Sequence, residues 1–310
     1  MTDRPSARTA ARRRRSTALA TGLACLALLL AVRAFAAARH AHDGQDRIQP
    51  SAVSWPRRGQ AALAIGAGRP AASPHQRPAP IASLAKVMTA YLTLRRYPLN
   101  GEADGFTITV TVAQAQSAAE SAAESQSVVA VRAGEQLTER QLLEGLLIPS
   151  GNNFAQMLAV HMAGSETRFT ADMNAEARAL GLRQTNYSDP SGFDPDTVST
   201  AADQLRVLRQ AMRFPVFRQI VSMAAVTLPV AGTLTNFNPL IAEGYAGKTG
   251  SDSAAGGCLA FFTHVTAEGH RWTAVGVVLG QGEGSDTSGL LAAAATAAEH
   301  LVASDGRAHN

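Results

Sequence analysis

The stretch from Ser83 to Leu94 constrains the fold more than any other part of the chain. Its sequence, SLAKVMTAYLTL, is mostly apolar and has a single charged residue, Lys86. A helix that is apolar all round is stable only where other elements cover it. We therefore expect residues 83–94 to form a helix that is buried on nearly all sides.

Hydrophobic periodicity places strands toward both ends of the chain and helices in its middle. Residues 61–66 and 106–112 are expected strands, and residues 117–127 a surface loop or short helix. Apolar residues at a spacing of three to four predict helices at 138–147, 154–162, 169–180 and 201–212. Later segments predict an antiparallel meander of strands at 244–250, 257–265 and 272–279, then a helix at 290–302. This order predicts an α/β (α+β) fold, in which helices flank an antiparallel sheet completed by both termini, with an inserted helical subdomain.

The N-terminal residues carry the signature of export. Arg12 to Arg15 are followed by an uncharged, mostly apolar run and then by small residues, with A-x-A cleavage sites ending at Ala36 and Ala38. The run is slightly shorter than the roughly 20 residues that span a bilayer. We expect residues 1–38 to be a signal peptide or an N-terminal anchor associated with the inner membrane. Either would place the rest of the chain in the periplasm or another extracytoplasmic space.

The formal net charge of +4 does not indicate a nucleic-acid partner. Residues 1–39 hold eight arginines and one aspartate, so the remainder has 20 basic and 23 acidic residues and a formal charge of −3. A nucleic-acid-binding domain needs a basic surface of its own. We therefore expect no nucleic-acid partner.

Lysine is rare in this chain, which makes its two lysines informative. Among 28 basic residues only Lys86 and Lys248 are lysines. Arginine stays protonated in proteins, whereas a buried lysine can lose its proton and act as a base. Lys86 follows Ser83 by three residues, which places both side chains on one helix face, and this pairing suits a nucleophile and its base.

Two further motifs follow the Ser-x-x-Lys pair along the chain. Ser150-Gly151-Asn152 falls between two expected helices, and Lys248-Thr249-Gly250 lies on the first strand of the meander. Each motif is a weak signal alone. The three motifs in this order are typical of β-lactamases and penicillin-binding proteins.

The chain resembles the low-molecular-mass penicillin-binding proteins, which are serine-type D-alanyl-D-alanine carboxypeptidases. The resemblance extends over roughly residues 53–300 and includes Ala82–Thr89, Phe169, Ser191–Asp194 and Gly257-Cys258-Leu259. It implies a β-lactamase/transpeptidase-like fold and a DD-peptidase catalytic domain at residues 53–303. Residues 39–52 would then be a lead-in and residues 304–310 a tail.

The resemblance also implies an activity, which is trimming of peptidoglycan stem peptides through an acyl-enzyme. Ser83 would form that acyl-enzyme with the penultimate D-alanine, Lys86 would be the general base, and Ser150 would relay a proton to the leaving amine. β-Lactam antibiotics would be covalent inhibitors. The resemblance implies no cofactor.

The same resemblance assigns the substrate-binding residues. Asn152 would hold the substrate amide and Lys86, Lys248 would supply positive potential, and Thr249 would bind the substrate carboxylate. Apart from the resemblance, Gly250 has no side chain and would let a ligand approach the backbone closely. The backbone N–H groups of Ser83 and Ser251 would form the oxyanion hole.

Two departures from the family pattern leave the substrate open. Asp252 stands where a threonine commonly follows Lys-Thr-Gly, and residues 281–289 lack the arginine that many members carry there. An acid gained and a base lost could weaken the binding of a free carboxylate. A peptidoglycan DD-endopeptidase therefore remains an alternative.

Other classes of function are distinguished by their motifs. Between Ser150 and Lys248 there is no Glu-x-x-Leu-Asn sequence, which a class A β-lactamase would need for deacylation. The chain has no G-x-S-x-G elbow, and its histidines lack zinc-protease spacing, so we expect no metal site. A non-hydrolytic sensor of β-lactams or muropeptides, which acylates without turnover, remains open.

Overall fold

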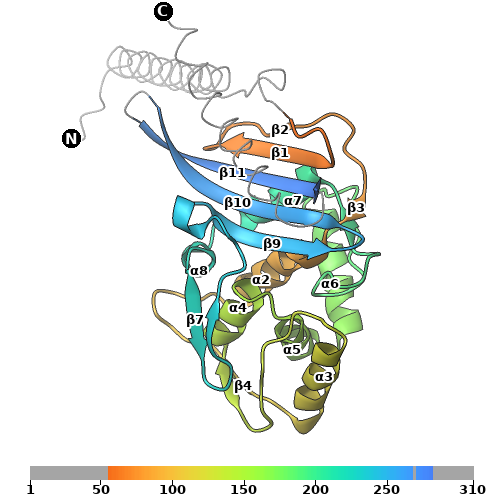
Figure 1. Ribbon diagram of the computed structural model, residues 1–310, viewed down its shortest axis with the longest axis vertical. Coiled ribbons are helices and arrows are strands. Elements are labelled where there is room, and N and C mark those ends of the chain that lie inside the picture. Colours follow the sequence, from red (N-terminus) through yellow and green to blue (C-terminus); the bar gives the residue numbers. More distant parts are fainter. Residues whose placement is uncertain (1–54, 268–269, 282–310) are drawn as a thin grey trace, which may run out of the picture. The chain divides into compact units, whose positions relative to one another are not determined.

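A five-stranded antiparallel sheet joins the two ends of the chain that the computed structural model describes, residues 55–267 and 270–281 (Figure 1). The strands follow the order β2-β1-β11-β10-β9. Their bounds are Ala71–Ala72 for β2, Gln60–Ile65 for β1, His270–Gln281 for β11, Gly256–Ala267 for β10 and Ala246–Asp252 for β9. The expected sheet completed by both ends of the domain is confirmed. The expected signal peptide or anchor, the tail and the helix at 290–302 lie outside the described residues.

Strand β1 runs antiparallel to β11 in a continuous register from Gln60 opposite Leu279 to Ile65 opposite Ala274. After Gln60 its residues are all apolar, and those from Ala61 to Ala64 are buried on both faces of the sheet. Ala62 and Ala64 point into the main hydrophobic core, whereas Ala61 and Leu63 belong to a second cluster on the other face. Because successive side chains of a strand point to opposite faces of the sheet, this one short strand contributes to both hydrophobic clusters.

The segment that contains Ser83 and Lys86 forms the centre of the helical part. A short 3-10 turn, η2 (Ala82–Leu84), leads into α2 (Ala85–Arg96). Every residue from Ala85 to Leu94 is buried, which confirms the expectation for this segment. Helices α4, α5, α6 and α7 all contact α2, and Figure 1 shows α2 beside the β9 edge of the sheet.

The remaining helices, apart from α8, lie near segments for which a helix was expected. Their bounds are Val112–Ala123 for α3, Glu139–Leu147 for α4, Asn152–Ala163 for α5, Glu166–Ala179 for α6, Ala201–Ala211 for α7 and Pro215–Val221 for α8. Thr111 and Thr138 begin α3 and α4 with capping boxes, in which Gln114 and Gln141 return the hydrogen bond. In the part of the chain that the structure describes, no helix is both long and apolar enough to cross a membrane.

Some short elements differ from the expectation. The expected strand at 106–112 is only β4, Thr107–Thr109, because Thr111 already caps α3. Helix α8 and the hairpin that follows it were not expected. The other short elements are β3 (Ala79–Pro80), β5 (Gln136–Thr138), β6 (Val198–Ser199), β7 (Ala225–Leu228), β8 (Gly232–Thr235) and η3 (Ile241–Glu243).

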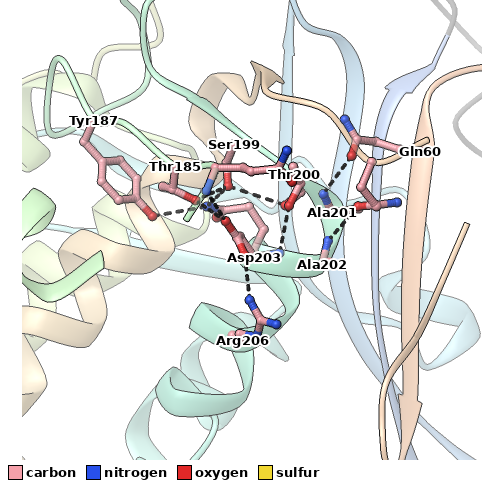
Figure 2. Close-up of polar contacts among 12 residues, drawn as sticks. Gln60, Thr185, Tyr187, Ser199, Thr200, Ala201, Ala202, Asp203 and Arg206 are labelled. Carbon is pink, nitrogen blue, oxygen red and sulfur yellow. Dashed lines mark hydrogen bonds and ion pairs between the residues drawn. The ribbon is translucent and has the colours of Figure 1, made fainter. Parts of the chain in front are cut away.

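Helix α7 is attached to the sheet by the polar network at its N-terminus that Figure 2 shows. Gln60 of β1 accepts a hydrogen bond from the backbone N–H of Ala201 at 3.2 Å. The carboxylate of Asp203 accepts from the Thr185 hydroxyl at 3.0 Å and from Arg206 at 2.7 Å. An acidic group in the first turn of a helix is favourable because backbone N–H groups are unpaired there. These bonds fix the helix that supports α2 from the sheet side.

Candidate active site

Ser83 lies in the turn η2, directly before the buried helix α2, and its side chain is half-buried. The preceding residue, Ala82, has a φ of 45°, which is uncommon for a residue other than glycine. Gly192 packs against this strained turn, and a Cβ atom at Gly192 would overlap the carbonyl oxygen of Ala82. The loop that carries Gly192 therefore supports the backbone conformation that presents Ser83.

Lys86 is fully buried and makes three hydrogen bonds. Its Nζ atom lies 2.7 Å from Oγ of Ser83, 2.7 Å from Oδ1 of Asn152 and 2.9 Å from the carbonyl oxygen of Ser191. The three partners come from the turn η2, from α5 and from the loop after α6. The fold thus brings three distant segments together on one amine.

The chemistry of these partners determines how a neutral Lys86 would be oriented. A neutral amine has two N–H groups and one lone pair. The amide oxygen of Asn152 and the carbonyl oxygen of Ser191 can only accept, so they take both N–H groups. The lone pair then faces Ser83, whose hydroxyl is the one partner that can donate a proton. The arrangement can therefore activate a serine hydroxyl.

The electrostatic surroundings favour the neutral form of this amine. Burial lowers the pKa of Lys86 well below its usual value, and the positive charge of Lys248 lowers it further, while Asp189 opposes both effects. Burial also lowers the pKa of Lys248 to about 7. Lys248 donates a hydrogen bond of 2.7 Å to the carbonyl oxygen of Thr249. The low pKa of Lys86 is what a lysine base near neutral pH requires.

The Ser150-Gly151-Asn152 segment leads into α5. Ser150 is buried and has a φ of 64°, so it too occupies the left-handed region. Gly151 is confined, because a Cβ atom there would lie 2.8 Å from Cγ2 of Val129. Asn152 reaches Lys86, whereas the Ser150 hydroxyl makes no hydrogen bond to Lys86 or Ser83 among the residues described.

The loop between α6 and β6 supplies a part of the site that sequence reasoning missed. Asp189 accepts hydrogen bonds from the backbone N–H groups of Ser191 and Gly192, each at 3.0 Å, and from the Thr197 hydroxyl at 2.9 Å. The loop also holds α2, since the Thr89 hydroxyl donates to the carbonyl oxygen of Pro190 at 2.7 Å. An Asp-Pro-Ser-Gly sequence is a turn signal that could have pointed to this role.

Strand β9 forms the edge of the sheet beside Ser83. A Cβ atom at Gly250 would lie 3.0 Å from the backbone nitrogen of Ser83 and 3.1 Å from the carbonyl oxygen of Ile81. The absence of a side chain therefore lets β9 approach the turn η2 closely. The neighbours Thr249 and Ser251 are half-buried and exposed, respectively.

Asp252 has a role in its own turn. Its Oδ1 atom accepts hydrogen bonds from the backbone N–H groups of Ala254 at 2.8 Å and Ala255 at 2.7 Å. Aspartate commonly stabilises turns in this way. The carboxylate of Asp252 thus stabilises the turn between β9 and β10. Within the described residues, no group of three His, Cys, Asp or Glu side chains could hold a metal ion.

Comparison with known proteins identifies a matching family. The family model described as D-alanyl-D-alanine carboxypeptidase, Peptidase_S11, matches residues 71–282. The chain is 36% identical over 185 residues to D-alanyl-D-alanine carboxypeptidase DacB2 of Mycobacterium tuberculosis, covering 57% of this chain and 59% of the relative. It is 30% identical over 200 residues to the D-alanyl-D-alanine endopeptidase of Escherichia coli, covering 59% of each. The chain thus spans less than two thirds of the length of these curated relatives.

Solved structures share the fold more completely. The Streptomyces K15 DD-transpeptidase superimposes with a TM-score of 0.69 at 26% identity, covering 81% of this chain and all of that one. A D-alanyl-D-alanine carboxypeptidase from Mycobacterium tuberculosis H37Rv superimposes with a TM-score of 0.61 at 30% identity, covering 76% and 87%. These neighbours confirm the expected transpeptidase-like fold, with its antiparallel sheet and inserted helices.

Proposed function

The chain belongs to the D-alanyl-D-alanine carboxypeptidase family Peptidase_S11, and on that premise we propose that it is a serine hydrolase that removes the terminal D-alanine from peptidoglycan stem peptides. The observation that carries the proposal is the contact of 2.7 Å between Nζ of a fully buried lysine, Lys86, and Oγ of Ser83. A buried amine with a lowered pKa beside a serine hydroxyl supports nucleophilic catalysis.

In the acylation step that we propose, Oγ of Ser83 attacks the carbonyl carbon of the penultimate D-alanine while its proton passes to Nζ of Lys86. The bond from this carbon to the nitrogen of the terminal D-alanine breaks, and Ser150 relays a proton to the leaving amine. The products are a serine ester and free D-alanine. Water then hydrolyses the ester, which restores the Ser83 hydroxyl and releases the shortened peptide.

Most of the proposed substrate-binding residues lie on β9, the edge strand of the sheet. The backbone N–H groups of Ser83 and Ser251 would stabilise the oxyanion, and the close packing of Gly250 against the Ser83 turn supports this arrangement. Thr249 would bind the terminal carboxylate, with positive potential from Lys248. Asn152 would hold the substrate amide as well as Lys86.

The proposed surroundings of the enzyme follow from its family and its N-terminal residues. Members act on the cell wall, which lies outside the cytoplasmic membrane, and the export signature expected at residues 1–38 agrees with that location. We propose peptidoglycan stem peptides as its partners and β-lactams as its covalent inhibitors.

The test uses a protein that begins after residue 38, given a stem pentapeptide and, separately, a fluorescent penicillin. The proposal predicts release of D-alanine and covalent labelling, both lost in Ser83→Ala. Labelling without any peptide cleavage would favour a sensor and contradict the hydrolase. No labelling of the wild type would contradict the serine assignment.

A DD-endopeptidase is the second candidate, favoured by the name of the Escherichia coli relative. The same acyl-enzyme chemistry would then cleave a cross-link between two stem peptides. A cross-linked peptide dimer separates the two candidates. Faster cleavage of the dimer than of the pentapeptide would favour the endopeptidase.

A further inference from the structure

A chain of hydrogen bonds extends beyond Asn152 to the surface. The Nδ2 atom of Asn152 donates to Oε1 of Gln126 at 3.0 Å, and Nε2 of Gln126 donates to Oε2 of Glu124 at 3.1 Å. Together with the bonds of Lys86 to Asn152 and Ser83, this chain links an exposed carboxylate to the nucleophile. Gln126 lies in the segment after α3 and carries none of the family motifs.

Gln126 is held firmly against α5. The backbone N–H of Asn152 donates to the carbonyl oxygen of Ser127 at 2.7 Å. Asn153 bonds both backbone groups of Val129, accepting from its N–H at 3.0 Å and donating to its carbonyl at 2.8 Å. The segment that carries Gln126 is therefore fixed to the helix N-terminus that carries Asn152.

The direction of the chain is set at its outer end. A carboxylate can only accept hydrogen bonds, so the bond to Glu124 uses the NH2 group of Gln126. Gln126 must then present its oxygen to Asn152, and Asn152 must present its NH2 group to Gln126 and its oxygen to Lys86. The polarity of each amide follows from that of the one before it.

Reversal of the Asn152 amide would interfere with the proposed base. The NH2 group of Asn152 would then face Lys86 and compete with the Ser83 hydroxyl for the lone pair of the neutral amine. Its oxygen would face the oxygen of Gln126, and two acceptors repel each other at this distance. The observed direction leaves the lone pair to Ser83.

We propose that Gln126 is a positioning residue, which orients the Asn152 amide so that neutral Lys86 accepts the proton of Ser83. The inference rests on the proposed function and adds a residue to its machinery. Gln126 acts through Asn152 and need not touch the substrate.

The experiment measures the first-order acylation constant and the noncovalent dissociation constant for a fluorescent penicillin in wild type and Gln126→Leu. We expect the acylation constant to fall roughly ten-fold, the effect of about one net hydrogen bond, with a smaller change in the dissociation constant. Gln116→Leu is the matched control, since it makes the same substitution at an exposed position of α3. It should acylate like the wild type.

A rescue variant separates orientation from mere packing. The double substitution Glu124→Gln with Gln126→Glu conserves the net charge and still offers Asn152 an acceptor, so it should recover most of the acylation constant. In this double variant the carboxylate lies at position 126, nearer to Lys86, where it would raise the pKa of Lys86 as Asp189 does. The acylation constants are therefore compared at their plateau values at high pH.

Three results would overturn the inference. Equal acylation by wild type and Gln126→Leu would remove the role of Gln126, and a double variant as slow as Gln126→Leu would show that the acceptor is not what matters. A wild type that penicillin does not acylate would overturn the proposed function and this inference with it. If penicillin labels the wild type, the proposed serine chemistry stands, and an unaffected Gln126→Leu variant then contradicts only the role of Gln126.

Discussion

The Nζ atom of Lys86 lies 2.7 Å from the Oγ atom of Ser83, and Lys86 has no exposed surface. Its other two hydrogen-bond partners can only accept, so a neutral Lys86 has one lone pair left for the serine proton. Burial and Lys248 lower its pKa and so favour the neutral form that this geometry requires.

Lys86→Arg should abolish acylation although it keeps the positive charge. A guanidinium stays protonated and has no lone pair to accept a proton from Ser83. We expect the acylation rate constant with penicillin to fall at least about 100-fold, as is typical for loss of a general base. Circular dichroism would check that the variant folds. Acylation at a rate near that of wild type would contradict the neutral-base role.

The acylation rate should rise with pH through the pKa of Lys86. Because the neutral amine is the active form, activity is lost as the pH falls below that pKa, which lies well below the ordinary value for lysine. Lys248→Met removes the nearby positive charge and should move the midpoint of the profile upward. Stopped-flow acylation over a pH series measures both midpoints. A midpoint that does not move would argue against coupling of the two amines.

The central residues of this site could be predicted from the sequence, but the loop residues that hold them in place could not. Ser83 and Lys86 are close because of helical spacing, and the scarcity of lysine marks the second amine at Lys248. The contacts of Asp189 and Gln126 depend on how loops from distant segments meet, and no periodicity reports that. Asp252 shows the converse, since its sequence position suggests an effect on the pocket whereas its carboxylate bonds the backbone of its own turn.

In the fold as well, some elements could be predicted from the sequence and others could not. Long periodic segments such as α7 were predicted within about one residue. The hairpin of β7 and β8 has four residues in each strand, too few to establish a period. Helix α8 has only seven residues, and Pro215 at its first turn was the available signal for its start.

Gly192→Ala should destabilise the protein and stop acylation. The added methyl group would overlap the backbone of Ala82, and Gly192 has a φ of 78°. We expect a loss of more than about 2 kcal/mol in the free energy of unfolding. Gly164→Ala is the matched control, with a φ of 79° but open space around it, and should cost only about 1 kcal/mol. Equal losses in the two variants would show that the contact with Ala82 contributes nothing.

Glu139→Gln should stabilise the protein above pH 7 and leave its stability nearly unchanged near pH 4. Glu139 is buried at the start of α4, its Oε1 atom has no partner among the described residues, and burial raises its pKa to about 7. The unfolded chain ionises this group near pH 4.5, so the energetic cost grows from there and is complete above pH 7.

Denaturant titrations at both pH values measure this difference. We expect a gain of about 1–3 kcal/mol at pH 8 for Glu139→Gln. Glu120→Gln, at an exposed position of α3, controls for the lost charge and should change stability little. A gain that is the same at pH 4 and pH 8 would contradict the raised pKa.

The most direct test of the central claim is the site of the penicillin adduct. The protein would be incubated with penicillin, its mass measured intact, and its peptides then mapped by mass spectrometry. Ser83 as the nucleophile predicts one adduct per chain, on the peptide that contains Ser83, and none in Ser83→Ala. An adduct on any other residue, or an adduct that persists in Ser83→Ala, would contradict the claim.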